Sequence, residues 1–292
     1  MQQISSVNFQ GSKVKQDKEK KNVKGGLLAI GANSLAALIP LPINTFIASQ
    51  LPKQSQTLTK DEINIVNKSA EDILEKITNL SKKGVVIENI DTAPISAITM
   101  PNWLRNVLDP IYATANGKNA FFNDNANKIL INKEKLPLAV FHEIGHAFNF
   151  NNSGFWKSMQ KMRLPMMIIG PLITLIPAFT KNHKAKEGEK LTTKQKISNG
   201  IRNASPILAA STMLPIILEE GKATLRGNDW AKEIFKQAPD LAKKVAKTNK
   251  WGLITYTITA AGLALTALIT KKVKDMTDEK LAFQSNVKMH QG

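Results

Sequence analysis

The sequence predicts an α+β fold that is mainly helical, with a small β element and with transmembrane or re-entrant helices. Apolar residues make up 42% of the 292 and are gathered in four runs, at 25–48, 164–179, 204–218 and 251–270. The segment 59–84 has the apolar period of an amphipathic helix, and VVIEN (85–89) and KILIN (128–132) have the composition of strands. Helical segments therefore outnumber strands.

The amphipathic segment carries its own start and stop signals. Thr59 and Glu62 have the spacing of a capping box, in which each side chain bonds the other residue's backbone N–H. Gly84 follows Lys82 and Lys83, as is typical of a helix C-terminus. This helix is predicted to be scaffold.

The fourth apolar run, 251–270, has 20 residues without a charge. A helix of that length measures about 30 Å, the thickness of the hydrocarbon core of a bilayer. It is predicted to be a transmembrane helix, with Trp251 at one interface and Lys271, Lys272 and Lys274 at the other. The alternative, a buried helix of a soluble protein, would need cover on all sides.

The other apolar runs are interrupted by proline and asparagine. The segment 25–49 is predicted to be an uncleaved membrane anchor, because it follows a disordered basic tail (1–24) and no small-residue cleavage site follows it. The segment 164–218 is predicted to be an apolar hairpin that either spans the membrane or re-enters it. A second basic tail is expected at 271–292.

Charge and composition favour a lipid bilayer over nucleic acid as the partner. The net charge is +17, but the basic residues lie beside apolar runs and aromatic residues are few. The chain is expected to be a multi-pass membrane protein, its orientation and oligomeric state left open. The absence of cysteine excludes disulfides and thiolate metal sites.

The stretch AVFHEIGHAF (139–148) carries the strongest chemical signal. A helix is predicted to begin near Pro137, so that His142 and His146, four residues apart, direct their imidazoles at one point. Two imidazoles at this spacing are typical ligands of zinc, and Glu143 is placed to act as the base on a metal-activated water.

A third protein ligand is needed, and without cysteine it is expected to be a carboxylate. Glu219 and Glu220, at the end of the third apolar run, are the candidates, and a carboxylate pair there is costly unless it has a purpose. The other interpretation is that the two are interfacial charges that cap a hydrophobic helix.

His142, Glu143 and His146, the apolar hairpin after them and EGKAT (220–224) together resemble the membrane-integrated zinc metallopeptidases that include the CaaX prenyl endoprotease and the bacterial heat-shock membrane protease. The third ligand of that family is the glutamate of an E-x-x-A-D pattern, which falls here on Glu220 and Ala223. Thr224 stands in place of the aspartate that braces a ligand histidine, which is a departure.

The resemblance covers about residues 128–226. It implies a gluzincin-type, zincin-like catalytic region within 50–163, a third-ligand helix within 219–250, and a strand at 128–132 that pairs with the substrate backbone. The expected ligands of Zn²⁺ are then His142, His146 and Glu220, with Glu219 as the alternative third ligand. The pattern of the residues also predicts an amphipathic segment within 219–250, with Trp230, Ile234 and Phe235 near one face, which either lies on the lipid surface or packs on the catalytic region.

The function implied is that of a zinc-dependent membrane endopeptidase, acting on a peptide or protein substrate with Glu143 as general base. Arg226 is considered as a stabiliser of the oxyanion, but a surface cation at a helix end is the preferred interpretation. Two alternatives from other classes stay open: a catalytically inactive relative that serves as a membrane scaffold, and a basic membrane-binding protein whose motif is accidental.

Overall fold

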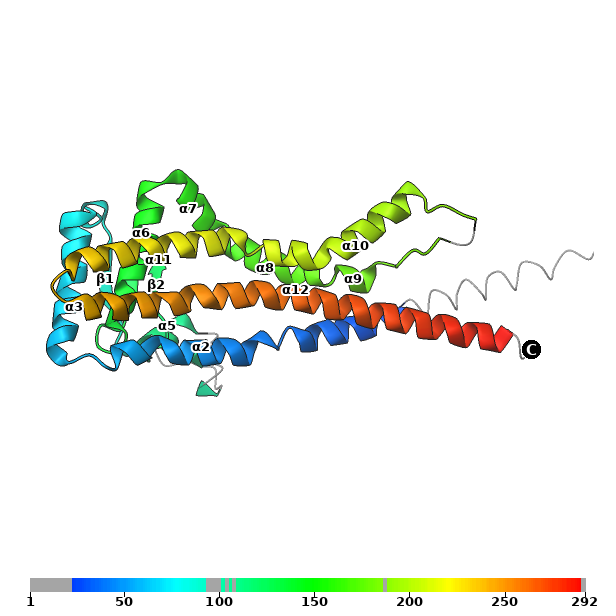
Figure 1. Cartoon of the computed structure of the whole chain (residues 1–292), viewed down its shortest axis with the longest axis horizontal. Helices are drawn as coiled ribbons and strands as arrows, with labels where there is room; N and C mark the ends of the chain where they lie inside the picture. The colour runs from blue at the N-terminus through cyan, green and yellow to red at the C-terminus, as the bar shows by residue number, and fades with distance from the viewer. Residues whose placement is uncertain (1–22, 93–100, 103–104, 107–108, 186–187, 290–292) are drawn as a thin grey trace, which may run out of the picture. The chain divides into compact units, whose positions relative to one another are not determined.

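The computed structural model of the chain describes residues 23–92, 101–102, 105–106, 109–185 and 188–289. These residues are mostly helical and include one three-stranded sheet, in agreement with the predicted α+β class (Figure 1). They divide into two compact units. Unit 1 comprises the described residues of Met1–Ile39, Met167–Thr212 and Ala260–Gly292, and unit 2 comprises those of Pro40–Met166 and Met213–Thr259.

The described helices follow one another along most of the chain. After a helix at 23–36 come α2 (Pro40–Ser55), α3 (Lys60–Asp72), α5 (Pro110–Ala115), α6 (Val140–Asn152), α7 (Gly154–Lys161), α8 (Arg163–Thr174), α9 (Ile176–Phe179), α10 (Thr193–Ser211), α11 (Leu214–Ile234) and α12 (Pro239–Met289). Short π or 3₁₀ turns lie at Ile73–Ile77, Ser81–Lys83 and Pro137–Ala139.

Helix α3 begins as the sequence predicts. The Thr59 hydroxyl accepts the backbone N–H of Glu62, and the Glu62 carboxylate accepts that of Thr59, at 3.2 and 2.7 Å. The helix passes through a π turn, and the segment ends at Gly84, whose φ of 77° lies in the left-handed region that favours glycine.

The sheet contains β1 (Val86–Asn89), β2 (Phe121–Asn123) and β3 (Lys128–Ile131), in the order β1-β3-β2. Strands β1 and β3 are those that the sequence predicts, whereas β2 has only three residues and no clear apolar pattern. Strand β3 pairs in parallel with β1 and antiparallel with β2. The expectation that 128–132 pairs with substrate is therefore wrong, because both edges of β3 are already hydrogen-bonded.

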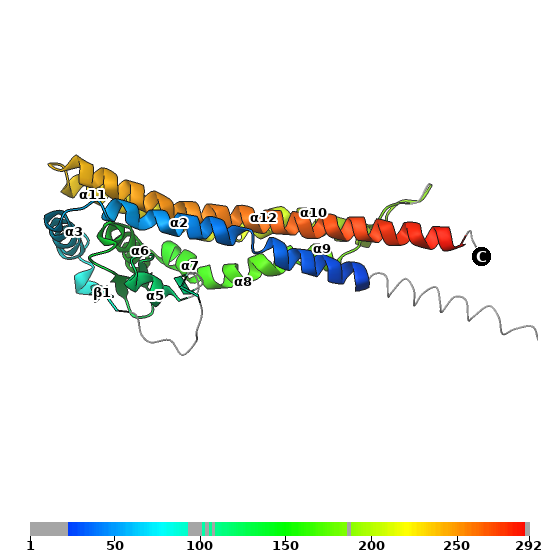
Figure 2. The ribbon, with the colours of Figure 1, turned by 90° about the horizontal axis from the view of Figure 1, so that it is seen from below.

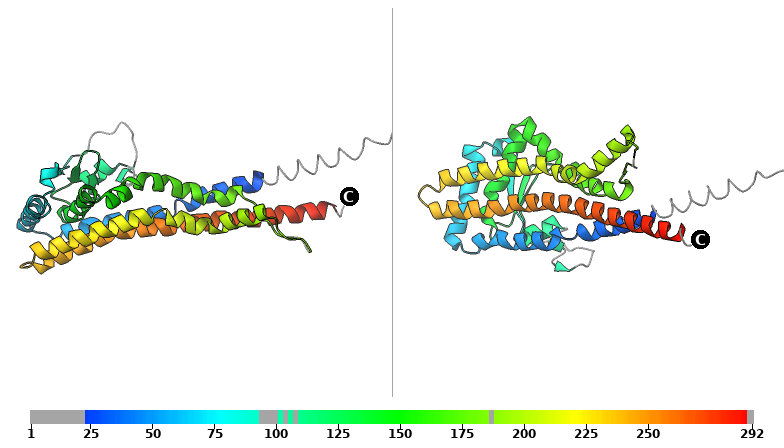
Figure 3. Two further views of the ribbon diagram at one scale, coloured as in Figure 1. Left: turned by 90° about the horizontal axis from the view of Figure 1, so that it is seen from above. Right: turned by 45° about the vertical axis from the view of Figure 1, so that its right-hand side comes forward.

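In unit 2, α6 lies between the sheet and α11, as Figures 2 and 3 show. Its buried side chains join a core with residues of α3, the sheet and the first turns of α12. Phe235, Leu241 and Val245 belong to this core and Trp230 packs against it. The amphipathic segment after Glu220 thus packs on the domain, the second of the two placements that the sequence allows.

Among the described residues, two helical segments are long and apolar enough to cross a membrane, Thr193–Ile234 and Pro239–Lys280. The second contains the predicted span at 251–270. A third results if Gly154–Lys161 and Arg163–Phe179, which are bent by 45°, count as one broken span or re-entrant loop. These segments support membrane association, and the multi-pass topology stays a prediction.

Two predicted boundaries look different in the structure. The segment 25–49 is divided between the helix at 23–36 and α2, so as an anchor it stays a prediction. The expected basic tail at 271–292 is a continuation of α12 as far as Met289, since its lysine, alanine and glutamate residues are good helix formers. Of the expected tail at 1–24, residues 1–22 lie outside the described residues.

Within unit 1, a buried asparagine joins three helices. The side-chain amide of Asn33 donates to the carbonyl and hydroxyl oxygens of Thr174 on α8, at 3.1 and 2.9 Å, and lies 2.9 Å from the hydroxyl of Thr270 on α12. A polar group among apolar helices is stabilising when its hydrogen bonds are satisfied.

Candidate metal centre

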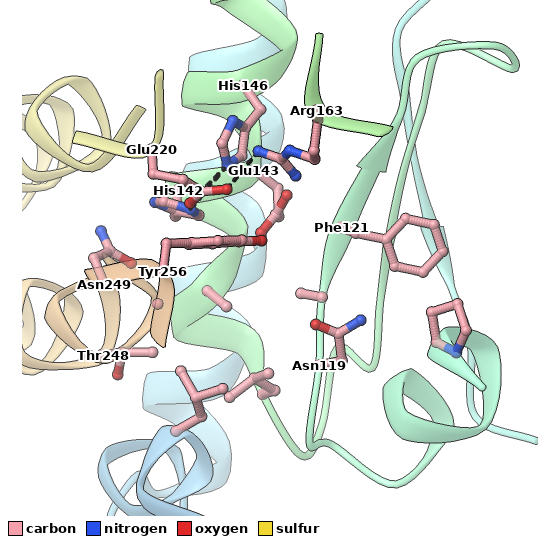
Figure 4. Close-up of a pocket in the computed structure, with 16 residues that line it drawn as sticks. Asn119, Phe121, His142, Glu143, His146, Arg163, Glu220, Thr248, Asn249 and Tyr256 are labelled. Atoms are coloured by element: carbon pink, nitrogen blue, oxygen red, sulfur yellow. Dashed lines mark hydrogen bonds and ion pairs between the residues drawn. The ribbon is translucent and has the colours of Figure 1, made fainter. Parts of the chain in front are cut away.

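Helix α6 presents the three residues of the motif at one place. His142, Glu143 and His146 are all buried, and the two imidazoles meet edge to face with ring centres 4.5 Å apart. Their Nε2 atoms lie 2.9 Å apart (Figure 4). The i, i+4 spacing thus brings both rings to one point, as the sequence predicts.

Helix α11 brings a carboxylate to the same point. Oε2 of Glu220 lies 3.0 Å from Nε2 of His142 and 3.4 Å from Nε2 of His146. The two nitrogens and this oxygen therefore form a triangle with sides of 2.9 to 3.4 Å. Three atoms that all carry lone pairs repel one another unless a proton or a cation lies between them.

The Nδ1 atom of each imidazole, on the side away from the triangle, contacts a polar side chain. Nδ1 of His146 lies 2.8 Å from a carboxylate oxygen of Glu219, and Nδ1 of His142 lies 3.2 Å from the hydroxyl of Thr224. These contacts fix the orientation of both rings and leave the two Nε2 atoms to face the shared point. Thr224, at the position where the resembling family has aspartate, thus contacts one of the two motif histidines.

Glu219 and Glu220 are therefore not interfacial charges at a helix end. Their residues are 0% and 2% exposed, and Glu219 also accepts hydrogen bonds from Asn149 and Gln160, at 2.8 and 2.7 Å. Burial alone would lower the pKa of His146, but the carboxylates of Glu219 and Glu220 raise it well above its usual value. The negative charge of these two carboxylates favours a cation at the place where the two Nε2 atoms and Glu220 meet.

Close packing of α6 on α11 makes this arrangement possible. A Cβ atom at Gly145 would overlap the backbone of Ala223, and one at Gly227 would lie 2.6 Å from the carbonyl oxygen of Phe141. The two helices can approach this far only because glycine occupies both positions. Gly145, inside the motif, is thus needed for the contact between the two ligand helices.

Buried groups here could hold a metal ion. The ligand atoms of His142, Glu143 and His146 lie within 4.8 Å of one another, as do those of His146, Glu219 and Glu220. Imidazole nitrogens and carboxylate oxygens are ordinary metal ligands. The triangle of His142, His146 and Glu220 is the set in which all three atoms point to one place.

Glu143 lies at the side of this triangle, on the wall of a cavity of about 210 Å³. Its carboxylate accepts the backbone N–H of Phe122 in β2 at 2.8 Å. Burial raises the pKa of Glu143, against the lowering effect of the two histidines. A raised pKa suits a group that must take up a proton and release it again.

The cavity also contains residues that the sequence did not point to. Arg163, at the start of α8, pairs with both glutamates, and Tyr256 of α12 reaches toward the same place (Figure 4). The α12 wall comprises Thr248, Gly252 and Tyr256, which recur every four residues, with Asn249 beside them. No motif carries these residues, and only the fold brings them together.

Arg226, considered from the sequence as an oxyanion stabiliser, does not line the described cavity. Its guanidinium donates to the side-chain oxygen of Asn149 at 2.6 Å and lies over the ring of Phe148. Through Asn149 it supports Glu219 from the far side.

Comparisons of the chain with protein-family models, curated proteins and solved structures find no match.

Proposed function

We propose that this chain is a zinc-dependent membrane endopeptidase of the gluzincin type, with His142, His146 and Glu220 as zinc ligands and Glu143 as general base. The observation that carries the proposal is the triangle of two Nε2 atoms and one carboxylate oxygen, with sides of 2.9 to 3.4 Å. The resemblance to the CaaX prenyl endoprotease and heat-shock membrane protease family, drawn from the sequence, agrees with it.

The donor set fits zinc. Tetrahedral ligands at about 2.1 Å from a zinc ion lie about 3.4 Å from one another, so the three atoms need to move apart by only a few tenths of an ångström. Two neutral nitrogens and one carboxylate leave a fourth position for water, the arrangement of catalytic rather than structural zinc sites. The contacts of Glu219 and Thr224 with the Nδ1 atoms supply the outer support that such sites have.

Bound zinc supplies a Lewis acid that lowers the pKa of water and polarises a carbonyl group. Glu143 takes the proton from the attacking water and passes it to the nitrogen of the leaving amine. The N–H of Phe122 holds the Glu143 carboxylate in place before it receives that proton. Because the residue is buried and its pKa is raised, the protonated form is accessible during the reaction.

The cavity offers room for the part of an extended polypeptide that lies next to the scissile bond. Residues 119–121, which lead into the edge strand β2, form one wall, and α12 forms another. At Gly252 a Cβ atom would meet only Nε2 of His142, at 3.9 Å, so the absence of a side chain keeps this wall open toward the metal centre. An extended substrate alongside residues 119–121 would lie next to Glu143, and this takes the place of the pairing expected with 128–132.

The two other functions are less well supported. A membrane scaffold has no need of a buried Glu143 that faces a cavity, nor of hydrogen bonds to both Nδ1 atoms. An accidental motif does not account for the convergence of α11 on the same point, since Glu220 lies 78 residues from His142 in sequence.

The test compares the full-length protein with its Glu143→Gln variant, both purified in detergent. We expect one equivalent of zinc in both proteins, and a rate of casein hydrolysis about 10²- to 10⁴-fold lower in the variant than in the wild type. His142→Ala, which removes a ligand, serves as the metal-free control. A wild-type protein without zinc would contradict the proposal, as would a Glu143→Gln variant that cleaves casein normally.

A further inference from the structure

We infer that Arg163 is the residue that stabilises the oxyanion formed from the scissile carbonyl, an inference that rests on the proposed peptidase function. Hydrolysis of an amide places negative charge on the carbonyl oxygen, and a positioned donor for that charge is worth about 10²- to 10³-fold in rate. The sequence motif provides ligands and a base but no such donor.

The contacts of Arg163 leave part of its guanidinium group available. Nη2 alone makes both ion pairs, with Oε1 of Glu220 and with Oε2 of Glu219, the latter at 3.3 Å. Nη1 and Nε have no hydrogen-bond partner among the described residues. The side chain is 32% exposed and lines the cavity, so a ligand in the cavity can contact it.

Arg163 also lies where a substrate must pass. It lines the cavity of about 210 Å³ and a second one of about 100 Å³, and Glu143 and His146 line both as well. Among the described residues that line either cavity, Arg163 is the only arginine or lysine. A carbonyl group beside Glu143 is therefore within the reach of one cationic donor.

The two glutamates give this arginine its fixed position. Holding an arginine side chain in one rotamer costs conformational entropy. The ion pairs with Glu219 and Glu220 already order Arg163 before substrate binds, so substrate binding does not have to order it. The ring of Tyr256, whose centre lies 5.5 Å from the Arg163 guanidinium, adds a cation–π contact. The donor is therefore preorganised, as stabilisation of a developing charge requires.

The chemical step uses these groups in a balanced way. The water oxygen bonds to the carbonyl carbon, its proton moves to Glu143, and the electron pair of the C=O double bond moves onto the carbonyl oxygen, which accepts a hydrogen bond from Arg163. When the C=O double bond re-forms, the C–N bond breaks and Glu143 returns the proton to the amine nitrogen. Arg163 keeps its own protons throughout.

Two dipeptide inhibitors with the same side chains separate this role from metal binding. A mercaptoacyl dipeptide binds zinc through one sulfur and has no oxygen at the position of the carbonyl, whereas a phosphinic dipeptide carries an anionic oxygen there. Their affinities are measured by calorimetry on the zinc-loaded, full-length protein in detergent, with the zinc content of each variant determined first.

We expect Arg163→Ala to weaken the phosphinic compound about 100-fold and the mercaptoacyl compound less than threefold. Arg163→Lys keeps the charge without the planar fork and should give an intermediate loss, and it replaces the alanine variant if that variant does not fold. Arg226→Ala removes an arginine that does not line the cavity and should leave the ratio of the two affinities unchanged. Tyr256→Phe should also leave it unchanged.

Equal losses for both compounds in the Arg163 variants would overturn this inference while the metal site stands. A selective loss with Tyr256→Phe and none with the Arg163 variants would move the role to Tyr256. A wild-type protein that holds no zinc and binds neither compound would overturn the proposed function itself.

Discussion

Oε2 of Glu219 lies 2.8 Å from Nδ1 of His146, on the side of the imidazole that faces away from Glu220. Two consecutive carboxylates on α11 therefore contact the same histidine through different nitrogens, since Glu220 lies 3.4 Å from Nε2. Within the proposed site, Glu220 is placed as a ligand and Glu219 as the group that orients the ligand histidine.

This difference predicts unequal losses of zinc affinity. Glu219→Gln keeps an acceptor for His146 and for the amides of Asn149 and Gln160, and should weaken zinc binding about 10- to 100-fold. Glu220→Gln replaces a ligand carboxylate with a poor neutral one and should weaken zinc binding further than that. Competition with a chelator measures both affinities, and a larger loss in Glu219→Gln would exchange the two roles.

Thr224 provides a test in which affinity can rise as well as fall. Its hydroxyl lies 3.2 Å from Nδ1 of His142, where the resembling family has an aspartate. Thr224→Asp should strengthen zinc binding up to about tenfold, because a carboxylate makes the imidazole a better ligand. Thr224→Val, which has nearly the same shape but no hydroxyl, should weaken it. The same chelator competition would show equal affinities if the contact has no role.

Gly145 is predicted to matter for stability and not only for the motif. In Gly145→Ala the new methyl group would overlap the backbone of Ala223, which cannot rotate away, and we expect a loss of about 2 kcal/mol or more in the free energy of unfolding. Gly221→Ala on α11 meets no atom within 4 Å and should be neutral or stabilising. Thermal unfolding in detergent compares them, and similar melting temperatures would refute the close contact.

Asn33 tests the packing of unit 1 independently of the metal site. Asn33→Ala removes the hydrogen bonds to Thr174 and Thr270 and should cost about 1–2 kcal/mol, seen as a lower melting temperature. Its neighbour Ser34 is exposed and, within the described part of the chain, its side chain bonds only the carbonyl of Ile30 in the same helix, so Ser34→Ala is the control. Zinc content should be normal in both variants, and a loss of zinc in Asn33→Ala would contradict separate roles.

Local patterns in the sequence determined a large part of this protein. The capping box at Thr59 and Glu62, the strands at 85–89 and 128–132 and the pairing of His142 with His146 depend on residues within a few positions of one another. The uncharged run at 251–270 likewise needs only its own length and composition to indicate a membrane segment. Such features follow from backbone geometry and short-range contacts, which a sequence shows directly.

Only the tertiary structure decided how distant segments meet. Helical periodicity places Glu219 and Glu220 about 100° apart, but which one faces the histidines depends on the packing of α11 on α6, through Gly145 and Gly227. The same packing, together with the position of the start of α8, brings Arg163 to the glutamates, although no sequence pattern near Arg163 predicts this ion pair. The sequence also did not predict that β3 lies between two strands, because β2 is too short to show the alternating apolar pattern of a strand. These features depend on long-range packing, which a local pattern does not specify.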